Sequence, residues 1–114
     1  MIKEEISWND FEKIDIRVGT IIEVYDFPEA RHPAYQLHID FGNEVGIKKS
    51  SAQITKRYQK EDLIAKQIIA VVNFPKKQIA NFMSECLVLG IVGDENDVVL
   101  LSPNLKVKNG LKMA

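Results

Sequence analysis

Residues 71–85 read VVNFPKKQIANFMSE, and the rest of the chain is arranged around this stretch. It opens as the end of an apolar strand and then passes through a Phe-Pro-Lys-Lys turn. Beyond the turn, aromatic and thioether side chains alternate with amides and a carboxylate. We therefore expect a buried strand that leads into a loop whose surface mixes apolar and cationic groups.

Two strand-like segments lie upstream of this stretch. Residues 15–24 alternate, which predicts a strand with one buried face; the expected inward residues are Ile16, Val18, Thr20, Ile22 and Val24. Gly19 inside this strand predicts a bulge or a sharp coil, which small barrels need to close. A loop with two prolines follows at residues 27–33.

The next segments predict a hairpin and a helix. Residues 34–41 form a second strand, residues 42–44 turn the chain, and residues 45–49 return as a third strand. The sequence from Ser51 to Tyr58 predicts a helix capped by Ser50 or Ser51. Ile54 and Tyr58 are spaced i,i+4 on its inward face.

The later strands complete an all-β fold. Residues 67–72 form a nearly continuous apolar strand that is buried on both sides, residues 86–92 form another, and residues 98–101 form the last one after a turn at 94–97. Five strands with a short helix between the third and the fourth is the order of a five-stranded OB-fold barrel. Residues 1–114 are expected to form this one domain, and nothing in the pattern predicts a parallel α/β sheet.

Both ends of the chain carry extensions to this barrel. A capping box at Ser7–Asp10 starts a helix over residues 8–13, and Asn109-Gly110 predicts a hairpin within residues 105–113. Trp8 and Phe11 either plug the barrel end or lie in a subunit interface. A lone hairpin is marginal in water, so its side chains must cover a second subunit or its own barrel. The expected homodimer contact is Trp8, Phe11, Val107, Leu111 and Met113.

Net charge, cysteine content and the lack of a long apolar run limit the partners and the compartment that we expect for the protein. The net charge is −1, so no global basic field recruits nucleic acid, although a local patch is sufficient. The single cysteine, Cys86, lies in an apolar run and is interpreted as a buried hydrophobe that suits a reducing compartment. A charged start without a signal-peptide core and the lack of a long apolar run predict a cytoplasmic protein without membrane insertion.

No motif for catalysis, cofactor or metal binding is present in the sequence. There is no phosphate loop, dinucleotide fingerprint or nucleophile elbow. Neither a His-Glu-x-x-His motif nor a cysteine pair offers metal ligands, and His32 and His38 lie in different elements. The expected function is therefore binding rather than catalysis, without a cofactor.

Two groups of cations mark the candidate binding surface. Lys48 and Lys49 precede the predicted helix, where cations, hydroxyls and free N–H groups suit an anion. The second group is Lys76 and Lys77, in the turn after Phe74-Pro75. The apolar side chains that flank these cations suit either stacking on bases or binding an extended peptide. The alternative is that Phe82 and Met83 belong to the core. The candidate peptide-binding or tRNA-binding residues are Lys48, Lys49, Gln53, Phe74, Lys76, Lys77, Asn81, Phe82, Met83 and Ser84.

Several blocks of the sequence resemble one family. These blocks are DIRVGTI at 15–21, FPEAR at 27–31, DFG at 40–42, GIK at 46–48, SSAQITKRY at 50–58 and AVVNFP at 70–75. They resemble CsaA, an export-associated chaperone within the tRNA-binding OB-domain family, which includes the C-terminal domain of methionyl-tRNA synthetase. The resemblance implies a homodimeric OB fold, chaperone activity on unfolded or presecretory polypeptides, and association with the SecA export motor. It also implies that tRNA is a possible partner.

One departure from the tRNA-binding relatives affects the ranking of partners. Those relatives tend to carry Gly-x-Ser-x-Gly-Met after the basic turn, whereas this sequence keeps Ser84 but has Phe82 and Cys86 at the glycines and Leu87 at the methionine. Backbone at a glycine approaches a ligand more closely than backbone under a phenylalanine, and a near-neutral chain lacks the electrostatic attraction that dominates RNA affinity. We therefore rank an ATP-independent chaperone first and a tRNA-binding protein second.

Overall fold

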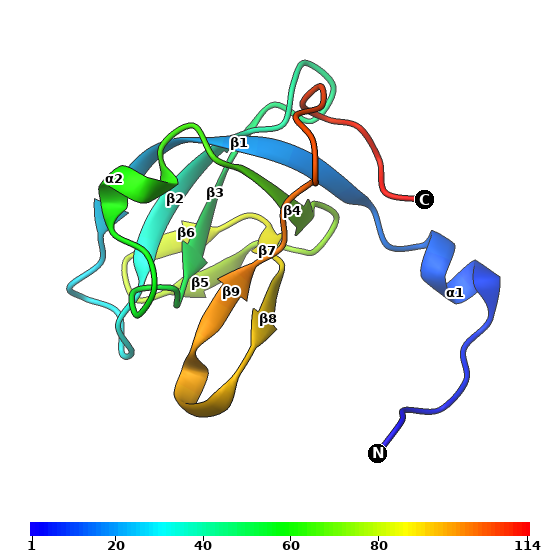
Figure 1. Ribbon diagram of the computed structural model, residues 1–114, viewed down its shortest axis with the longest axis horizontal. Helices are drawn as coiled ribbons and strands as arrows, with labels where there is room; N and C mark the ends of the chain where they lie inside the picture. Colours follow the sequence, from blue (N-terminus) through cyan, green and yellow to red (C-terminus); the bar gives the residue numbers. More distant parts are fainter.

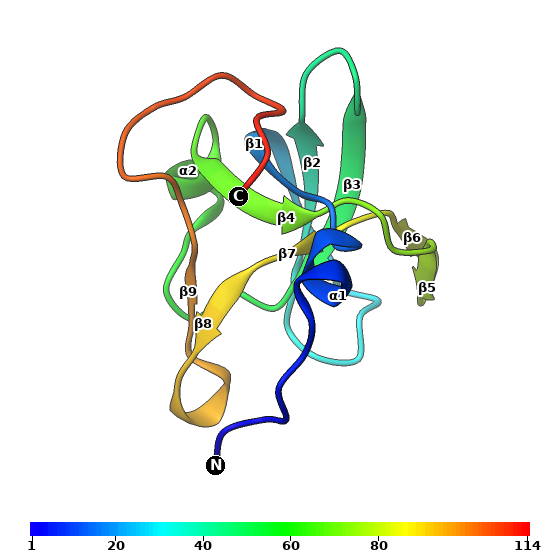
Figure 2. The same cartoon turned by 90° about the vertical axis from the view of Figure 1, so that its right-hand side faces the viewer.

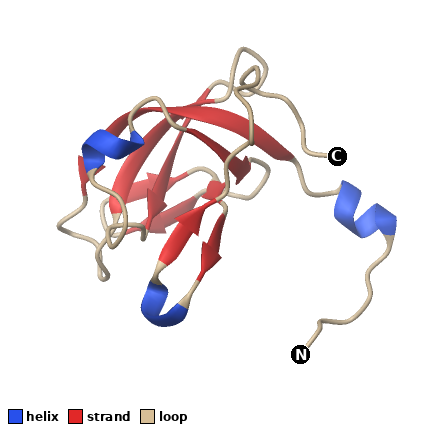
Figure 3. Ribbon diagram, viewed as in Figure 1, coloured by secondary structure: helices blue, strands red, loops and turns tan.

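A computed structural model describes residues 1–114 as a small, nearly closed antiparallel barrel (Figure 1). Its main sheet has the order β3-β2-β1-β4-β7. The five strands are β1 (Ile16–Asp26), β2 (Tyr35–Asp40), β3 (Ile47–Ala52), β4 (Gln67–Val71) and β7 (Leu87–Val88). Strands dominate the molecule, and helices are few and short (Figure 3). The all-β OB-fold class predicted from the strand order is confirmed.

The remaining elements decorate this barrel. Two small hairpins pair β5 (Lys77–Ile79) with β6 (Phe82–Ser84) and β8 (Gly90–Val92) with β9 (Val98–Leu100). The helices are α1 (Trp8–Glu12), α2 (Lys60–Leu63) and the 3₁₀ turn η1 (Asp94–Asn96). The hairpin of β8 and β9 projects from the barrel in both views (Figures 1 and 2).

The phase of the first strand differs from the expectation. Ile21 is fully buried, whereas Ile22 is exposed and Val18 and Thr20 are only half-buried. The register shifts between Ile21 and Glu23, so the bulge lies there and not at Gly19. Gly19 instead provides space, because a Cβ on it would lie 2.6 Å from Cγ2 of Ile39 and 2.7 Å from Cδ1 of Phe41. The side chains of Ile39 and Phe41 therefore pack directly against the backbone of Gly19.

The predicted helix over residues 51–58 is wrong. β3 continues through Ser50 and Ser51 to Ala52, and the helix is the single turn α2 further along. Ser50 is 1% exposed and pairs with Leu37 of β2, so the antiparallel ladder prevails over the i,i+4 spacing. Ile54 is nevertheless buried and Tyr58 packs on the core. The helix still lies between the third and fourth barrel strands, as predicted.

The predicted strand over residues 86–92 is divided in two. β7 pairs with β4 in the barrel, whereas β8 leaves it and pairs with β9. Ile91 and Val92 are therefore 61% and 69% exposed instead of buried. Leu100 at the end of β9 reaches the core. The hairpin of β2 with β3 and the capping box of α1 are confirmed.

The C-terminal tail does not form the predicted hairpin. Residues 16–19 of β1 pair with β4 on one side, and β2 does not pair with them on the other. The tail lies along this free side, where the amide of Val18 donates to the carbonyl of Leu111 at 3.1 Å. The amides of Gly110 and Met113 donate back to the carbonyls of Val18 and Ile16, at 2.7 and 2.9 Å. The Asn109-Gly110 pair does turn the chain, with Gly110 at φ +91°. The tail therefore folds back on its own barrel, which is one of the two alternatives that the sequence left open.

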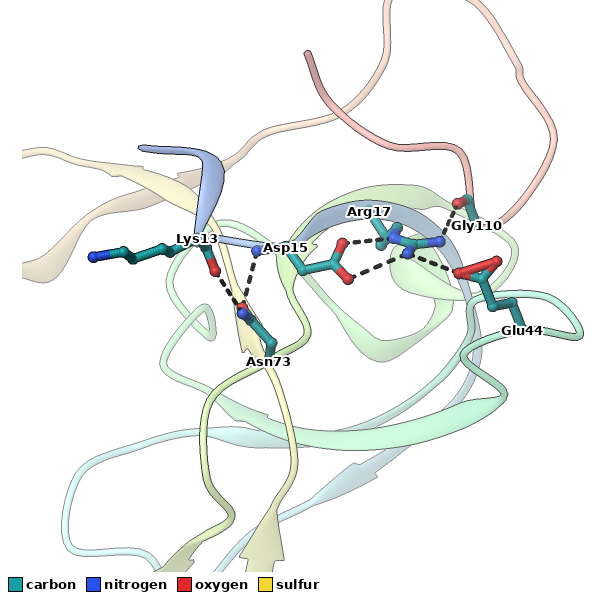
Figure 4. Close-up of polar contacts among 6 residues, drawn as sticks. All are labelled: Lys13, Asp15, Arg17, Glu44, Asn73 and Gly110. Atoms are coloured by element: carbon teal, nitrogen blue, oxygen red, sulfur yellow. Dashed lines mark hydrogen bonds and ion pairs between the residues drawn. The ribbon is translucent and has the colours of Figure 1, made fainter. Parts of the chain in front are cut away.

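Arg17 holds several segments of the fold together, and nothing in the sequence pattern predicted this (Figure 4). Its guanidinium donates to the Asp15 carboxylate at 2.6 and 3.2 Å, to Glu44 at 2.9 Å and to the carbonyl of Gly110 at 3.1 Å. The hydrogen bonds with Arg17 lower the pKa of Asp15 despite its partial burial. Arg17 is 6% exposed and thus links β1, the β2–β3 turn and the tail in one buried contact.

Candidate ligand-binding groove

The candidate site is a groove beside the hairpin of β5 and β6. β4 ends at Val71, the chain passes Phe74 and Pro75, and the hairpin then brings the chain back toward β3. The groove has a volume of about 460 Å³. Its apolar lining residues are Phe74, Pro75, Ile79 and Leu87, and its other lining residues are Ser51, Lys76, Lys77, Ser84 and Cys86. The side chains of Phe74 and Leu87 are about half exposed and available to a ligand.

Hydrogen bonds to β3 fix the floor of this groove. The amide of Ser51 donates to Oγ of Ser84 at 3.3 Å, and the amide of Glu85 donates to the carbonyl of Lys49 at 2.8 Å. Oγ of Ser84 in turn donates to the carbonyl of Cys86 at 3.4 Å. Ser84 is therefore a buried structural link between the hairpin and the barrel.

Phe82 does not lie on the open surface where we expected it. It is 7% exposed and forms a small cluster with Phe27 and Ala34, and the ring centroids of Phe27 and Phe82 are 5.4 Å apart. In OB folds the loops after the first and fourth strands border the ligand face. The Phe27–Phe82 contact joins these two loops, so Phe82 shapes the site from beneath instead of touching a ligand.

The lysines lie around a carboxylate that the sequence analysis did not single out. One oxygen of Glu85 accepts from the amide of Lys49 at 3.0 Å, and the other lies 3.6 Å from Nζ of Lys76. Partial burial favours the protonated form of Glu85. The Lys49 amide and the charges of Lys76, Lys49 and Lys48 outweigh that effect, and the pKa of Glu85 is lowered. No local sequence signal singles out Glu85, because its partner Lys49 is 36 residues away and only the fold brings the two together.

The remaining predicted residues, which include Lys48 and Lys49, do not line the groove. Lys48 and Lys49 lie within β3, so the expectation that they precede a helix N-terminus is wrong. Nζ of Lys49 lies 5.2 Å from the centroid of the Phe82 ring. Gln53 is exposed just after β3, and Asn81 and Met83 are exposed on the hairpin, all outside the lining of the groove.

Cys86 lines the groove but is chemically quiet. Its side chain is buried, and burial raises the pKa of its thiol to about 12. It is therefore a thiol rather than a thiolate near neutral pH, as the interpretation of a small buried hydrophobe requires.

The expected dimer residues are only partly brought together. Phe11 and Met113 line a second hollow, of about 380 Å³, between α1 and the tail. Val107 lies elsewhere, with its amide and carbonyl bonded to Gln67. Leu111 and Met113 are 49% and 44% exposed. Trp8 is 84% exposed, because α1 stands away from the barrel, so it does not plug the barrel end (Figure 1).

Two further searches of the structure bear on the chemistry of the protein. No group of three or more histidine, cysteine, aspartate or glutamate side chains is placed to hold a metal ion. None of the helices has the length and apolar character needed to cross a membrane.

Comparison with known proteins shows two sets of relatives. The family model described as a putative tRNA binding domain matches residues 16–112. The crystal structure of chaperone CsaA from Bacillus anthracis strain Ames is 55% identical, covering 97% of this chain and 100% of that one, with a TM-score of 0.93. CsaA chaperone protein from Picrophilus torridus is 59% identical, covering 96% of this chain and 100% of that one, with a TM-score of 0.90.

The curated relatives are much longer proteins. Methionine–tRNA ligase of Pyrococcus horikoshii is 38% identical over 110 residues, and that of Thermococcus onnurineus is 34% identical over 110 residues. These alignments cover 96% of this chain but only 15% and 14% of the ligases. The chain thus spans about one seventh of the length of the curated relatives that it matches.

Proposed function

This chain belongs to the putative tRNA-binding domain family and, within it, to the CsaA chaperones, and from that premise we propose that it binds exposed segments of unfolded polypeptides without ATP. The family is a binding family and not a catalytic one. The observation that carries the proposal is the groove beside the hairpin, whose walls are largely apolar and whose rim is cationic. A half-exposed Phe74 and Leu87 offer apolar contact to a client segment.

The proposed mechanism is reversible holding. A protein that binds the unfolded state of a client lowers the free concentration of that state by mass action and slows its aggregation. The groove needs no nucleotide for this, because binding alone supplies the effect. Adaptable contacts to an extended segment also suit clients of varied sequence.

The wider setting is part of the same proposal. We place the protein in the cytoplasm, with unfolded or presecretory polypeptides as clients and the SecA export motor as a partner, on the resemblance to CsaA. We also propose that residues 1–114 act as one unit that forms a homodimer through its terminal extensions. The exposed Trp8 on the projecting α1 supports this, because a side chain of this size lies almost entirely in solvent within one copy of the chain.

The test of the chaperone proposal removes the apolar walls. Phe74→Ser plus Leu87→Ser should weaken protection of an aggregating unfolded client about tenfold or more, since each lost apolar contact is worth about 1–2 kcal/mol. The measurement is client light scattering against protein concentration. Ile91→Ser plus Val92→Ser removes comparable exposed apolar surface outside the groove and serves as the control. Equal protection by both variants would rule out the groove as the client site.

The family match supports tRNA as a second candidate ligand. The same lysines, Lys48, Lys49, Lys76 and Lys77, would then contact phosphates, and affinity would fall steeply with added salt. Titration of labelled tRNA at low and moderate salt separates the two. Tight, salt-sensitive binding that unfolded peptide cannot displace would place tRNA first.

A further inference from the structure

We propose that the groove selects polypeptide segments in which an apolar side chain is flanked by acidic residues, and that it disfavours segments flanked by basic residues. This inference rests on the proposed function, since it names the class of client that the same groove takes. It follows from the distribution of charge at the groove and not from its apolar walls.

The cations at the groove are incompletely neutralised. Lys76 and Lys77 line the groove, whereas Lys48 and Lys49 lie on the neighbouring strand β3, outside its lining. Of these four lysines, only Lys76 lies within ion-pair distance of a carboxylate, 3.6 Å from Glu85. Lys48, Lys49 and Lys77 take part in no ion pair. The whole chain carries a net charge of −1, so this local surplus of positive charge is a property of the site and not of the molecule.

Glu85 and Glu23 are already engaged within the chain. Glu85 is held by the amide of Lys49, its side chain is 20% exposed, and its single charge is shared among Lys76, Lys49 and Lys48. Glu23, which pairs with His38 opposite Lys49 in the sheet, lies 3.4 Å from Nδ1 of His38 and accepts from the hydroxyl of Tyr25. Lys77, which lines the groove and takes part in no ion pair, is therefore open to a carboxylate of the ligand.

The apolar walls decide between a polypeptide and a nucleic acid. Phe74, Pro75, Ile79 and Leu87 form a hollow into which an aliphatic or aromatic side chain fits. Phe82, one of the aromatic side chains that the sequence analysis considered for stacking on a base, is buried against Phe27. An apolar hollow with lysines at its rim matches a segment such as leucine or phenylalanine next to glutamate or aspartate.

The experiment compares two labelled peptides of equal length that share a Leu-Ala-Phe centre, one flanked by glutamates and the other by lysines. We expect the glutamate-flanked peptide to bind about tenfold more tightly at low salt, because its carboxylates pair with the exposed lysines whereas the lysine-flanked peptide is repelled by them. The two affinities should converge near 1 M salt, where the Debye length is about 3 Å. Fluorescence anisotropy of the full-length protein measures both.

Charge reversal at the groove provides the decisive variant. Lys76→Glu plus Lys77→Glu should remove or invert the preference, whereas Lys106→Glu plus Lys108→Glu makes the same change of net charge on the exposed tail and should leave it intact. Equal binding of the two peptides, or equal effects of the two variants, would overturn the inference while leaving the chaperone proposal standing. Binding that Phe74→Ser plus Leu87→Ser does not weaken would remove the proposed function itself.

Competition with RNA tests whether the lysines bind the phosphates of a nucleic acid instead of the carboxylates of a polypeptide. An oligouridylate should fail to displace the glutamate-flanked peptide at moderate salt. Displacement that depends on Lys76 and Lys77 but is indifferent to Phe74 and Leu87 would assign the lysines to RNA and overturn the inference.

Discussion

At the scale of single residues, Glu85 helps to hold the groove together, because it joins β3 to the segment after the hairpin and pairs with Lys76. Its pKa is lower in the folded protein than its ordinary value of 4.5. A lowered folded pKa gives a stabilising contribution that is complete above the unfolded value and is lost as the pH falls through the folded value.

Glu85→Gln should therefore lower the free energy of unfolding by about 1 kcal/mol at pH 7. The difference from the unaltered protein should begin to shrink as the pH falls below 4.5 and should vanish once the pH lies below the lowered folded pKa of Glu85. Urea unfolding at a series of pH values measures this, with Glu29→Gln in the exposed loop as control. A difference that stays constant down to acid pH would contradict the assignment.

The residues of the site were only partly predictable. The sequence correctly brought Phe74, Lys76 and Lys77 to one surface, because a Pro-Lys-Lys turn after a buried strand must emerge at the barrel rim. It could not show that Phe82 is buried, since its partner Phe27 is more than fifty residues away in sequence and only folding makes them neighbours. Glu85 was missed for the same reason, as its role depends on the register of β3.

At the scale of elements, pairing between strands that are distant in sequence explains where the predicted helices and strands differ from the structure. The alternation of residues 34–41 and the following turn identified the β2–β3 hairpin, because both signals are local. The spacing of Ile54 and Tyr58 predicted a helix that the pairing of Ser50 with Leu37 excludes. Asn109-Gly110 marks a turn correctly, but its partner strand, β1, is distant in sequence and could not be read from the tail alone.

The tail behaves as an irregular additional strand, and its removal should be costly. Deletion of the residues after Pro103 takes away three backbone hydrogen bonds of β1 and the Gly110 acceptor of Arg17. We expect a loss of about 3 kcal/mol or more and a tendency to aggregate, because an unpaired strand edge is exposed. Thermal unfolding and light scattering measure both effects. Deletion of residues 1–6 is the control, and a stable, well-behaved dimer after the tail deletion would refute the assignment.

At the scale of the whole molecule, the N-terminal arm is the clearest sign of a partner. α1 begins with a complete capping box yet contributes no residue to the core. A five-residue helix is too short to persist in water without tertiary contacts. The proposed homodimer would give this arm a surface beyond its own barrel, on a second copy of the chain related by two-fold symmetry.

Trp8→Ser should shift the proposed homodimer to monomer, weakening association by about 2 kcal/mol or more, since buried tryptophans dominate interfaces. The stability of the monomer itself should change by less than about 0.5 kcal/mol, because Trp8 contacts little of its own barrel. Sedimentation equilibrium of the variant measures the first effect. Ile91→Ser, also strongly exposed but on β8 outside the terminal extensions, should leave association unchanged. A monomeric unaltered protein would refute the dimer.

The contact between Phe27 and Phe82 sets a condition on any redesign of this protein. Because the two rings clasp the loop after β1 to the hairpin after β4, neither loop is an independent cassette. Transplanting the hairpin alone onto another barrel would leave Phe82 without its packing partner, and the graft would lose the shape of the groove. The two loops therefore form one structural unit, and a mutant library that varies one of them must vary the other as well.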